Sequence, residues 1–135
     1  GIVSICGGTL IAPGWVLTAC HCLVEDSTQL RAAAKVEVKL GLTKRGVFSG
    51  VERITAHATY CHPLYRGGGY SDNYDFGLIQ LAQKSTRQPA KLARSESWYT
   101  IGSSETTLGF GGAGAASNYQ ASNQLYKLSV ALTTS

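Results

Sequence analysis

The side chains best suited to chemistry gather around one histidine. His21 stands between Cys20 and Cys22, and a second cysteine–histidine pair, Cys61-His62, follows later in the chain. Thiolate and imidazole groups are common zinc ligands in proteins. An imidazole can also act as a general base that activates a nucleophile. The residue types therefore suggest either a metal site or proton-transfer chemistry.

The spacing disfavours a metal site. Successive residues on an extended segment point to opposite sides, so Cys20, His21 and Cys22 cannot easily converge on one tetrahedral ion. The sequence also lacks the C-x-x-C and H-x-x-x-H spacings of common zinc sites. We therefore expect no metal ion.

A glycine pattern raises a second alternative. Gly109, Gly111 and Gly114 satisfy the spacing of a dinucleotide-binding loop. The residues after them do not begin an amphipathic helix, and no acidic residue follows Glu105 to bind a ribose. A glycine-rich hairpin explains the pattern better, and we expect no cofactor.

Short strands must position His21. Residues 9–11 and 15–18 are rich in strand-forming side chains and are separated by a Pro13-Gly14 turn. Val36 to Leu40 alternates apolar and polar residues, as a half-buried strand does, and Gly46 to Ile54 is predicted as the next strand. The remaining segments of this half are predicted as connections: a polar loop over 25–29, a loop start at His62-Pro63 and a flexible connection over 66–71.

Composition narrows the class of protein. The 135 residues suffice for one modest domain with a core. The net charge of +4 comes from scattered Lys and Arg, which does not indicate nucleic-acid binding, and no apolar run is long enough to span a membrane. The four cysteines suit an oxidising compartment. Because the chain has no methionine, we expect a processed form or a fragment.

The stretch from Ile5 to Leu23 resembles a known family. It reads Ile-Cys-Gly-Gly-Thr-Leu-Ile-Ala-Pro-Gly-Trp-Val-Leu-Thr-Ala-Cys-His-Cys-Leu. Trypsin/chymotrypsin-like serine proteases carry Cys-Gly-Gly-Ser-Leu-Ile followed by Trp-Val-Leu-Thr-Ala-Ala-His-Cys. The resemblance implies that His21 is the general base and that a Cys6–Cys22 disulfide lies beneath it. Cys20 stands where the family usually has a small residue.

The other two cysteines have no assigned partner from this resemblance. On a strand, Cys20 and Cys22 would point the same way, which predicts that Cys20 is buried against the barrel. We expect Cys20 and Cys61 to be free thiols rather than a second disulfide.

Asp75 is the second candidate catalytic residue. An aspartate before an apolar run is ordinarily a turn residue at the start of a strand. Here Asn73 to Leu81 resembles the family's Asn-x-Asp-Ile-Ala-Leu-x-x-Leu, and it follows the histidine in the family's His…Asp…Ser order. The resemblance implies that Asp75 accepts a hydrogen bond from the far nitrogen of His21, which fixes its tautomer and stabilises the imidazolium.

The later chain resembles the start of the family's second barrel. Thr106 to Gly111 resembles its Thr-Gly-Trp-Gly strand, and Gln124 to Leu132 resembles the strand that follows. The implied fold is all-β, a trypsin-like antiparallel β-barrel. Residues 1–95 would form a nearly complete first barrel that lacks its first strand, and residues 96–135 the opening strands of a truncated second barrel.

The nucleophile of this family is not in the sequence. The family's Gly-Asp-Ser-Gly-Gly is absent, and Asp26-Ser27 lacks the glycines. We therefore expect a fragment of a secreted, extracellular trypsin-like serine endopeptidase, inactive as this chain alone and monomeric at full length, that acts on protein or peptide substrates. The alternative is a catalytically inactive homologue that serves as a secreted binding or inhibitor protein and recognises a target enzyme.

Overall fold

The computed structural model describes residues 6–26, 28–67, 73–95, 100–111 and 122–133. Nearly all of their regular secondary structure is β, as expected, with two short 3-10 turns beside the strands. The strands of these residues are β1 (Thr9–Ala12), β2 (Trp15–Thr18), β3 (Val24–Asp26), β4 (Gln29–Leu30), β5 (Glu37–Leu40), β6 (Glu52–Cys61), β7 (Gly77–Leu81), β8 (Ser104–Gly109) and β9 (Tyr126–Ala131), and the 3-10 turns are Cys20–Cys22 and Ala33–Lys35.

The chain divides into two packed units. The first unit comprises Gly1–Leu40 and Val51–Lys91, and the second comprises Gly41–Gly50 and Leu92–Ser135. Both candidate catalytic residues, His21 and Asp75, belong to the first unit.

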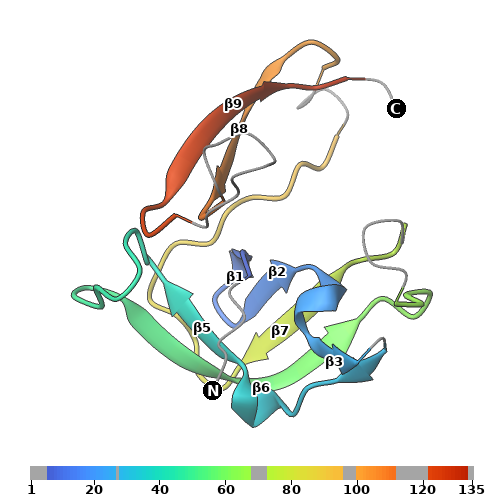
Figure 1. Cartoon of the computed structure of the whole chain (residues 1–135), viewed down its shortest axis with the longest axis vertical. Helices are drawn as coiled ribbons and strands as arrows, with labels where there is room; N and C mark the ends of the chain where they lie inside the picture. Colours follow the sequence, from blue (N-terminus) through green and yellow to red (C-terminus); the bar gives the residue numbers. More distant parts are fainter. Residues whose placement is uncertain (1–5, 27, 68–72, 96–99, 112–121, 134–135) are drawn as a thin grey trace. The chain divides into compact units, whose positions relative to one another are not determined.

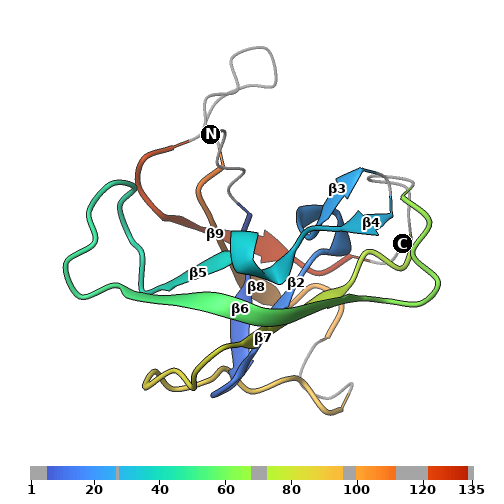
Figure 2. The same cartoon turned by 90° about the horizontal axis from the view of Figure 1, so that it is seen from below.

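One curled antiparallel sheet forms the first unit. Its strand order is β1-β2-β7-β6-β5, and each neighbouring pair is antiparallel. The sheet curls into a half-barrel in Figure 1, and Figure 2 shows the long β6 running beside β5 and β7. The predicted hairpin around Pro13-Gly14 is confirmed, because Leu10 pairs with Val16 across the turn.

The core of the first unit follows from strand alternation. In β7, Gly77, Ile79 and Leu81 are buried and the two residues between them are half-buried. Side chains from β1, β2, β6 and β7 and from Leu23 pack into one apolar cluster. The buried members of this cluster are Leu10, Val16, Leu23, Ile54, Ala56, Ile79 and Leu81.

A bulge changes the alternation of β6. Ile54 and Ala56 are buried, the register with β7 shifts between Ala56 and Ala58, and Thr59 is the next buried residue. An extra residue in one strand of an antiparallel pair turns the side chains beyond it to the opposite face. The bulge therefore directs Cys61, at the end of β6, toward the core, where it packs against both apolar clusters.

Two predictions about local structure, one of a strand and one of a loop, were wrong. The strand expected over 46–54 begins only at Glu52, because Gly46 and Gly50 adopt φ angles of 79° and 70°, which belong to turns. The polar loop expected over 25–29 overlaps a small antiparallel pair of strands, β3 and β4, in which Asp26 pairs with Gln29 and Val24 with Leu30.

The second unit contains the hairpin β8–β9, in which Thr107 pairs with Leu128. The two strands predicted over 106–111 and 124–132 are thus confirmed, each with shifted ends. Residues 41–50 join this unit through the backbone: the Arg45 N–H donates to the Asn123 carbonyl at 2.7 Å. No helix among the described residues is long and apolar enough to cross a membrane.

Candidate active site

His21 lies on a tight 3-10 turn that follows β2. The turn covers Cys20–Cys22 and closes through two backbone hydrogen bonds, from the Cys22 N–H to the Ala19 carbonyl at 3.2 Å and from the Leu23 N–H to the Cys20 carbonyl at 2.8 Å. A 3-10 turn has about three residues per turn, so three consecutive side chains point in three directions. The prediction that Cys20 and Cys22 point the same way was wrong, because it assumed an extended segment and the segment is a 3-10 turn.

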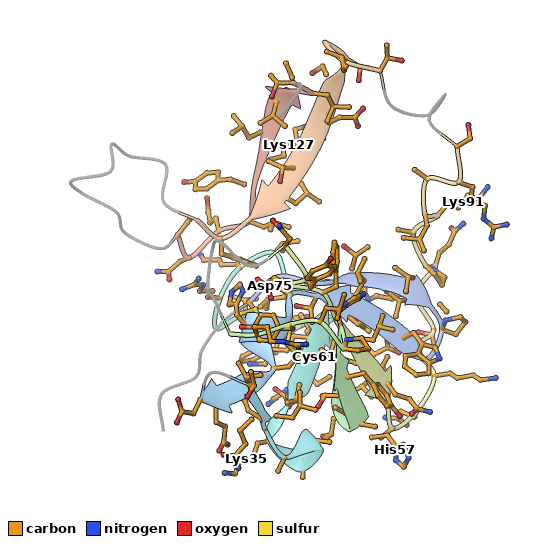
Figure 3. All side chains as sticks on the ribbon, turned by 90° about the vertical axis from the view of Figure 1, so that its right-hand side faces the viewer. Lys35, His57, Cys61, Asp75, Lys91 and Lys127 are labelled. Atoms are coloured by element: carbon orange, nitrogen blue, oxygen red, sulfur yellow. A yellow bond between two sulfur atoms is a disulfide. The ribbon has the colours of Figure 1, made fainter. Side chains whose placement is uncertain are left out.

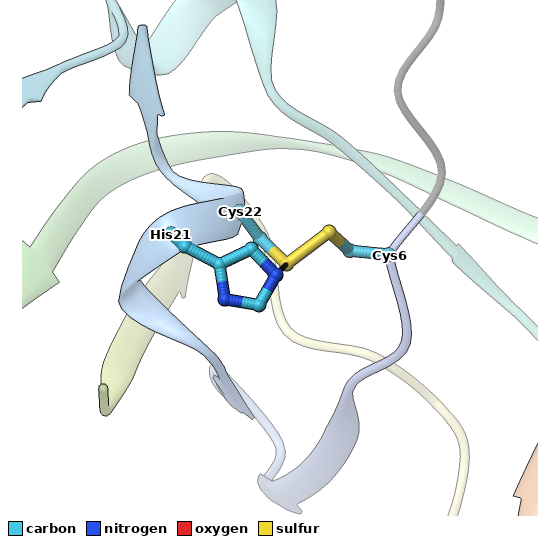
Figure 4. A group of neighbouring side chains, drawn as sticks. All are labelled: Cys6, His21 and Cys22. Atoms are coloured by element: carbon cyan, nitrogen blue, oxygen red, sulfur yellow. Dashed lines mark hydrogen bonds between the residues drawn. A yellow bond between two sulfur atoms is a disulfide. The ribbon is translucent and has the colours of Figure 1, made fainter. Parts of the chain in front are cut away.

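Cys22 is joined to Cys6 by a disulfide, with the two Cα atoms 6.1 Å apart. The imidazole of His21 lies against this disulfide in Figure 4, and its Nε2 is 3.6 Å from the Cys22 sulfur. One donor atom from each of Cys6, His21 and Cys22 lies within 4.8 Å of the others, a spacing that suits a metal ion. A metal ion binds cysteine as the thiolate, however, and the two cysteine sulfurs here are joined in a disulfide, so neither is a thiolate.

Cys20 and Cys61 form a second disulfide, with Cα atoms 5.2 Å apart. The prediction that both are free thiols was therefore wrong. Two features that the sequence did not reveal explain the error: the 3-10 turn points Cys20 away from Cys22, and the bulge in β6 points Cys61 inward. Cys20 is fully buried, as predicted, in a small cluster with Val24 and Tyr65.

Asp75 lies just before β7 and contacts His21 with both carboxylate oxygens. Oδ1 accepts the His21 backbone N–H at 2.8 Å, and Oδ2 lies 2.6 Å from Nδ1 of the imidazole. The side chain of Asp75 is 20% exposed and that of His21 is 48% exposed. The imidazole is therefore held by one edge and open to solvent over much of its surface.

The environment of Asp75 favours its charged form. Burial alone would raise the pKa of this carboxyl group, but hydrogen bonds from the His21 ring and from the backbone N–H groups of His21 and Cys20, together with the charge of the imidazole, outweigh burial and lower it. An ionised Asp75 accepts a hydrogen bond from the Nδ1–H of His21, which keeps the proton on Nδ1 and leaves Nε2 as the basic nitrogen. A histidine in this state can accept a proton from a hydroxyl group.

Gly77 is a further residue of the site that sequence reasoning did not single out. A Cβ atom at this position would lie 2.7 Å from Leu23 Cδ1 and 3.3 Å from the backbone carbonyl of Ala19. The start of β7 therefore approaches the His21 turn so closely that a larger residue would require the Leu23 side chain to shift. The only available signal was a small residue two positions after Asp75.

Comparisons with known proteins identify the family of the chain. The family model described as Trypsin matches residues 2–135. The chain is 35% identical over 83 residues to proproteinase E of Bos taurus, covering 59% of this chain and 30% of that protein. It is 29% identical over 115 residues to trypsin 5G1 of Aedes aegypti, covering 82% of this chain and 40% of that protein.

A solved structure is also similar. Neuropsin, a serine protease expressed in the limbic system of mouse brain, matches with a TM-score of 0.75 and 25% identity, over 96% of this chain and 55% of that one. The chain spans 30% of the bovine relative and 40% of the mosquito relative. Family match, relatives and fold agree, and the chain belongs to the trypsin-like serine protease family.

Proposed function

We propose that this chain is part of a secreted trypsin-like serine endopeptidase in which His21 is the general base and Asp75 orients it. The observation that carries the proposal is the double contact of Asp75 with His21, to the ring at 2.6 Å and to the backbone at 2.8 Å. A side chain that served only a turn would have no reason to bind both the ring and the backbone of a single histidine.

The chemistry follows from the protonation of the pair. Asp75 accepts a hydrogen bond from the His21 Nδ1–H, so Nε2 is free to accept the proton of an attacking serine hydroxyl, and the carboxylate then stabilises the imidazolium. The same imidazolium returns its proton to the leaving amine. The serine belongs to a part of the protein beyond this sequence, which contains no Gly-Asp-Ser-Gly-Gly. By itself this chain would therefore hold the base and no nucleophile.

The substrates and the compartment are part of the same proposal. The family acts on peptide bonds, so we propose proteins and peptides as substrates. Two disulfides in a small chain suit secretion into an oxidising environment. We also propose that residues 1–95 correspond to the first barrel of the family and residues 96–135 to the start of the second.

A covalent probe of activated serines tests the proposal. Residues 1–135 and the product of the complete transcript would each be treated with a fluorophosphonate, with His21→Ala in the longer protein as the control. We expect labelling of the longer protein alone and its loss in His21→Ala. Labelling of neither protein would favour the inactive homologue, and labelling of residues 1–135 that depends on His21 would contradict the assignment of the nucleophile.

A further inference from the structure

Asp75 lies at the centre of a tight turn, and the two residues that flank it in the chain are not buried in the core. The Phe76 N–H donates to the Tyr74 carbonyl at 2.8 Å, which closes a three-residue turn around Asp75. Neither neighbouring residue is buried in the core, since Tyr74 is 41% exposed and Phe76 is 57% exposed. Packing of these two side chains into the core therefore contributes little to the position of the carboxylate.

His62 contacts this turn on both sides of Asp75. Its backbone N–H donates to the Phe76 carbonyl at 2.9 Å. Its imidazole stacks on the Tyr74 ring, with the ring centroids 4.9 Å apart and the planes inclined by 16°. Stacked rings attract one another beyond the effect of area burial alone. A single residue thus fixes the residue before Asp75 through its ring and the residue after it through its backbone.

The orientation of the His62 ring is itself fixed locally. The Leu64 N–H donates to Nδ1 of His62 at 3.2 Å, and the Tyr65 N–H donates to the His62 carbonyl at 2.9 Å. The turn after β6 therefore holds the imidazole in one rotamer, with Nδ1 as an acceptor. This preformed ring is a rigid surface against which Tyr74 can stack.

A covalent link completes the arrangement. Cys61, the residue before His62, is bonded to Cys20, the residue before His21. The contacts therefore form a closed circuit that runs from His21 to Asp75, through the turn at 74–76 to His62, and back through the Cys61–Cys20 disulfide. Both members of the candidate pair are tied to the adjacent residues Cys61 and His62.

We propose that His62 is a positioning residue for Asp75: its stack on Tyr74 and its hydrogen bond to Phe76 hold the carboxylate in reach of His21. The catalytic meaning of this role depends on the proposed function, but the role itself does not require a nucleophile. It can therefore be tested on residues 1–135 by measuring the His21–Asp75 contact directly.

Nuclear magnetic resonance of the whole chain provides the measurement. The Nδ1–H proton of His21 would be followed for its exchange with water, and the Asp75 carboxyl carbon for its titration. The variants are His62→Ala, which removes the stacked ring, His62→Phe, which restores a ring, and His57→Ala as the matched control. His57 is exposed on β6 and lies well apart from Asp75 in Figure 3.

We expect the Nδ1–H proton to exchange about two- to tenfold faster in His62→Ala, as the loss of one ring pair implies, and the pKa of Asp75 to move up toward its ordinary value. His62→Phe should restore most of both readouts, and His57→Ala should change neither. If His62→Ala does not fold, Tyr74→Ala against Tyr74→Phe makes the same comparison. A folded ring-deleting variant with unchanged proton exchange and an unchanged Asp75 pKa would overturn the proposal. Such a result would leave the endopeptidase assignment intact, since that assignment is tested by labelling.

Discussion

Asp75 binds His21 at two points of the same residue, the imidazole Nδ1 and the backbone N–H, with a different carboxylate oxygen at each. Two hydrogen bonds to one residue fix both the ring rotamer and the turn that carries it. This relationship links residues 54 positions apart in the chain.

The first prediction concerns the stability of the fold at acid pH. The pKa of Asp75 lies below its ordinary 3.8 in the folded chain, because the hydrogen bonds from His21 and Cys20 outweigh the opposing effect of burial. A lowered folded-state pKa adds stability that is present above the unfolded value and is lost as the pH falls through the folded value. Asp75→Asn should therefore be less stable than wild type at about pH 6, with the gap closing toward about pH 2. Urea unfolding of both proteins across this pH range measures the difference in their free energies of unfolding. A difference that widens as the pH falls would contradict a lowered pKa of Asp75 as its cause.

The second prediction concerns the two disulfides. Cys20–Cys61 closes a separation of 41 residues, and Cys6–Cys22 closes one of 16 residues. In the chain-entropy model these loops stabilise the fold by about 4 and about 3 kcal/mol. Replacing both members of the first pair by alanine should therefore reduce the free energy of unfolding more than the same change in the second pair.

Peptide mapping without reduction checks the connectivity that this comparison assumes. We expect Cys6 linked to Cys22, Cys20 linked to Cys61 and no thiol that reacts after unfolding. A count of two free thiols would restore the original expectation for Cys20 and Cys61.

The third prediction concerns Gly77. The Cβ of an alanine there would lie 2.7 Å from Leu23 Cδ1, so the buried Leu23 side chain must shift, and 3.3 Å from the Ala19 backbone, which is a tight contact. We expect Gly77→Ala to lower the free energy of unfolding by about 1–3 kcal/mol, as overpacking does. Gly14→Ala is the matched control, because a Cβ there meets nothing within 4 Å. Equal stability of the two variants would contradict the prediction and would show that Leu23 and the start of β7 can shift to accommodate the added methyl group.

These features differ in how far the sequence predicts them. The hairpin beside His21 and the partnership of His21 with Asp75 follow from local patterns and from the resemblance of residues 5–23 and 73–81 to one family. The Cys20–Cys61 bond does not, because it depends on a 3-10 turn and a β-bulge, each of which reverses the direction of a side chain. Neither leaves a clear mark in the alternation of apolar and polar residues.

The role of His62 shows the same limit. Its sequence context, His-Pro before a turn, predicted a loop residue, and His62 does lie in the connection directly after β6. Its stack on Tyr74 joins residues from two separate loops, so the contact depends on the antiparallel register of β6 and β7. A register of this kind is set by the whole sheet rather than by nearby residues.

The central claim is that Asp75 acts through His21 in peptide hydrolysis, and an Asp75→Asn variant of the protein made from the complete transcript tests it most directly. Asparagine can still accept the His21 backbone N–H, but its amide group would face Nδ1 and favour the wrong tautomer of the ring. The measurement is kcat for a peptide substrate, with Asp26→Asn, an exposed change in β3, as the control. We predict a loss of about four orders of magnitude for Asp75→Asn and no change for Asp26→Asn. A loss of less than about tenfold in a folded Asp75→Asn protein would contradict the claim.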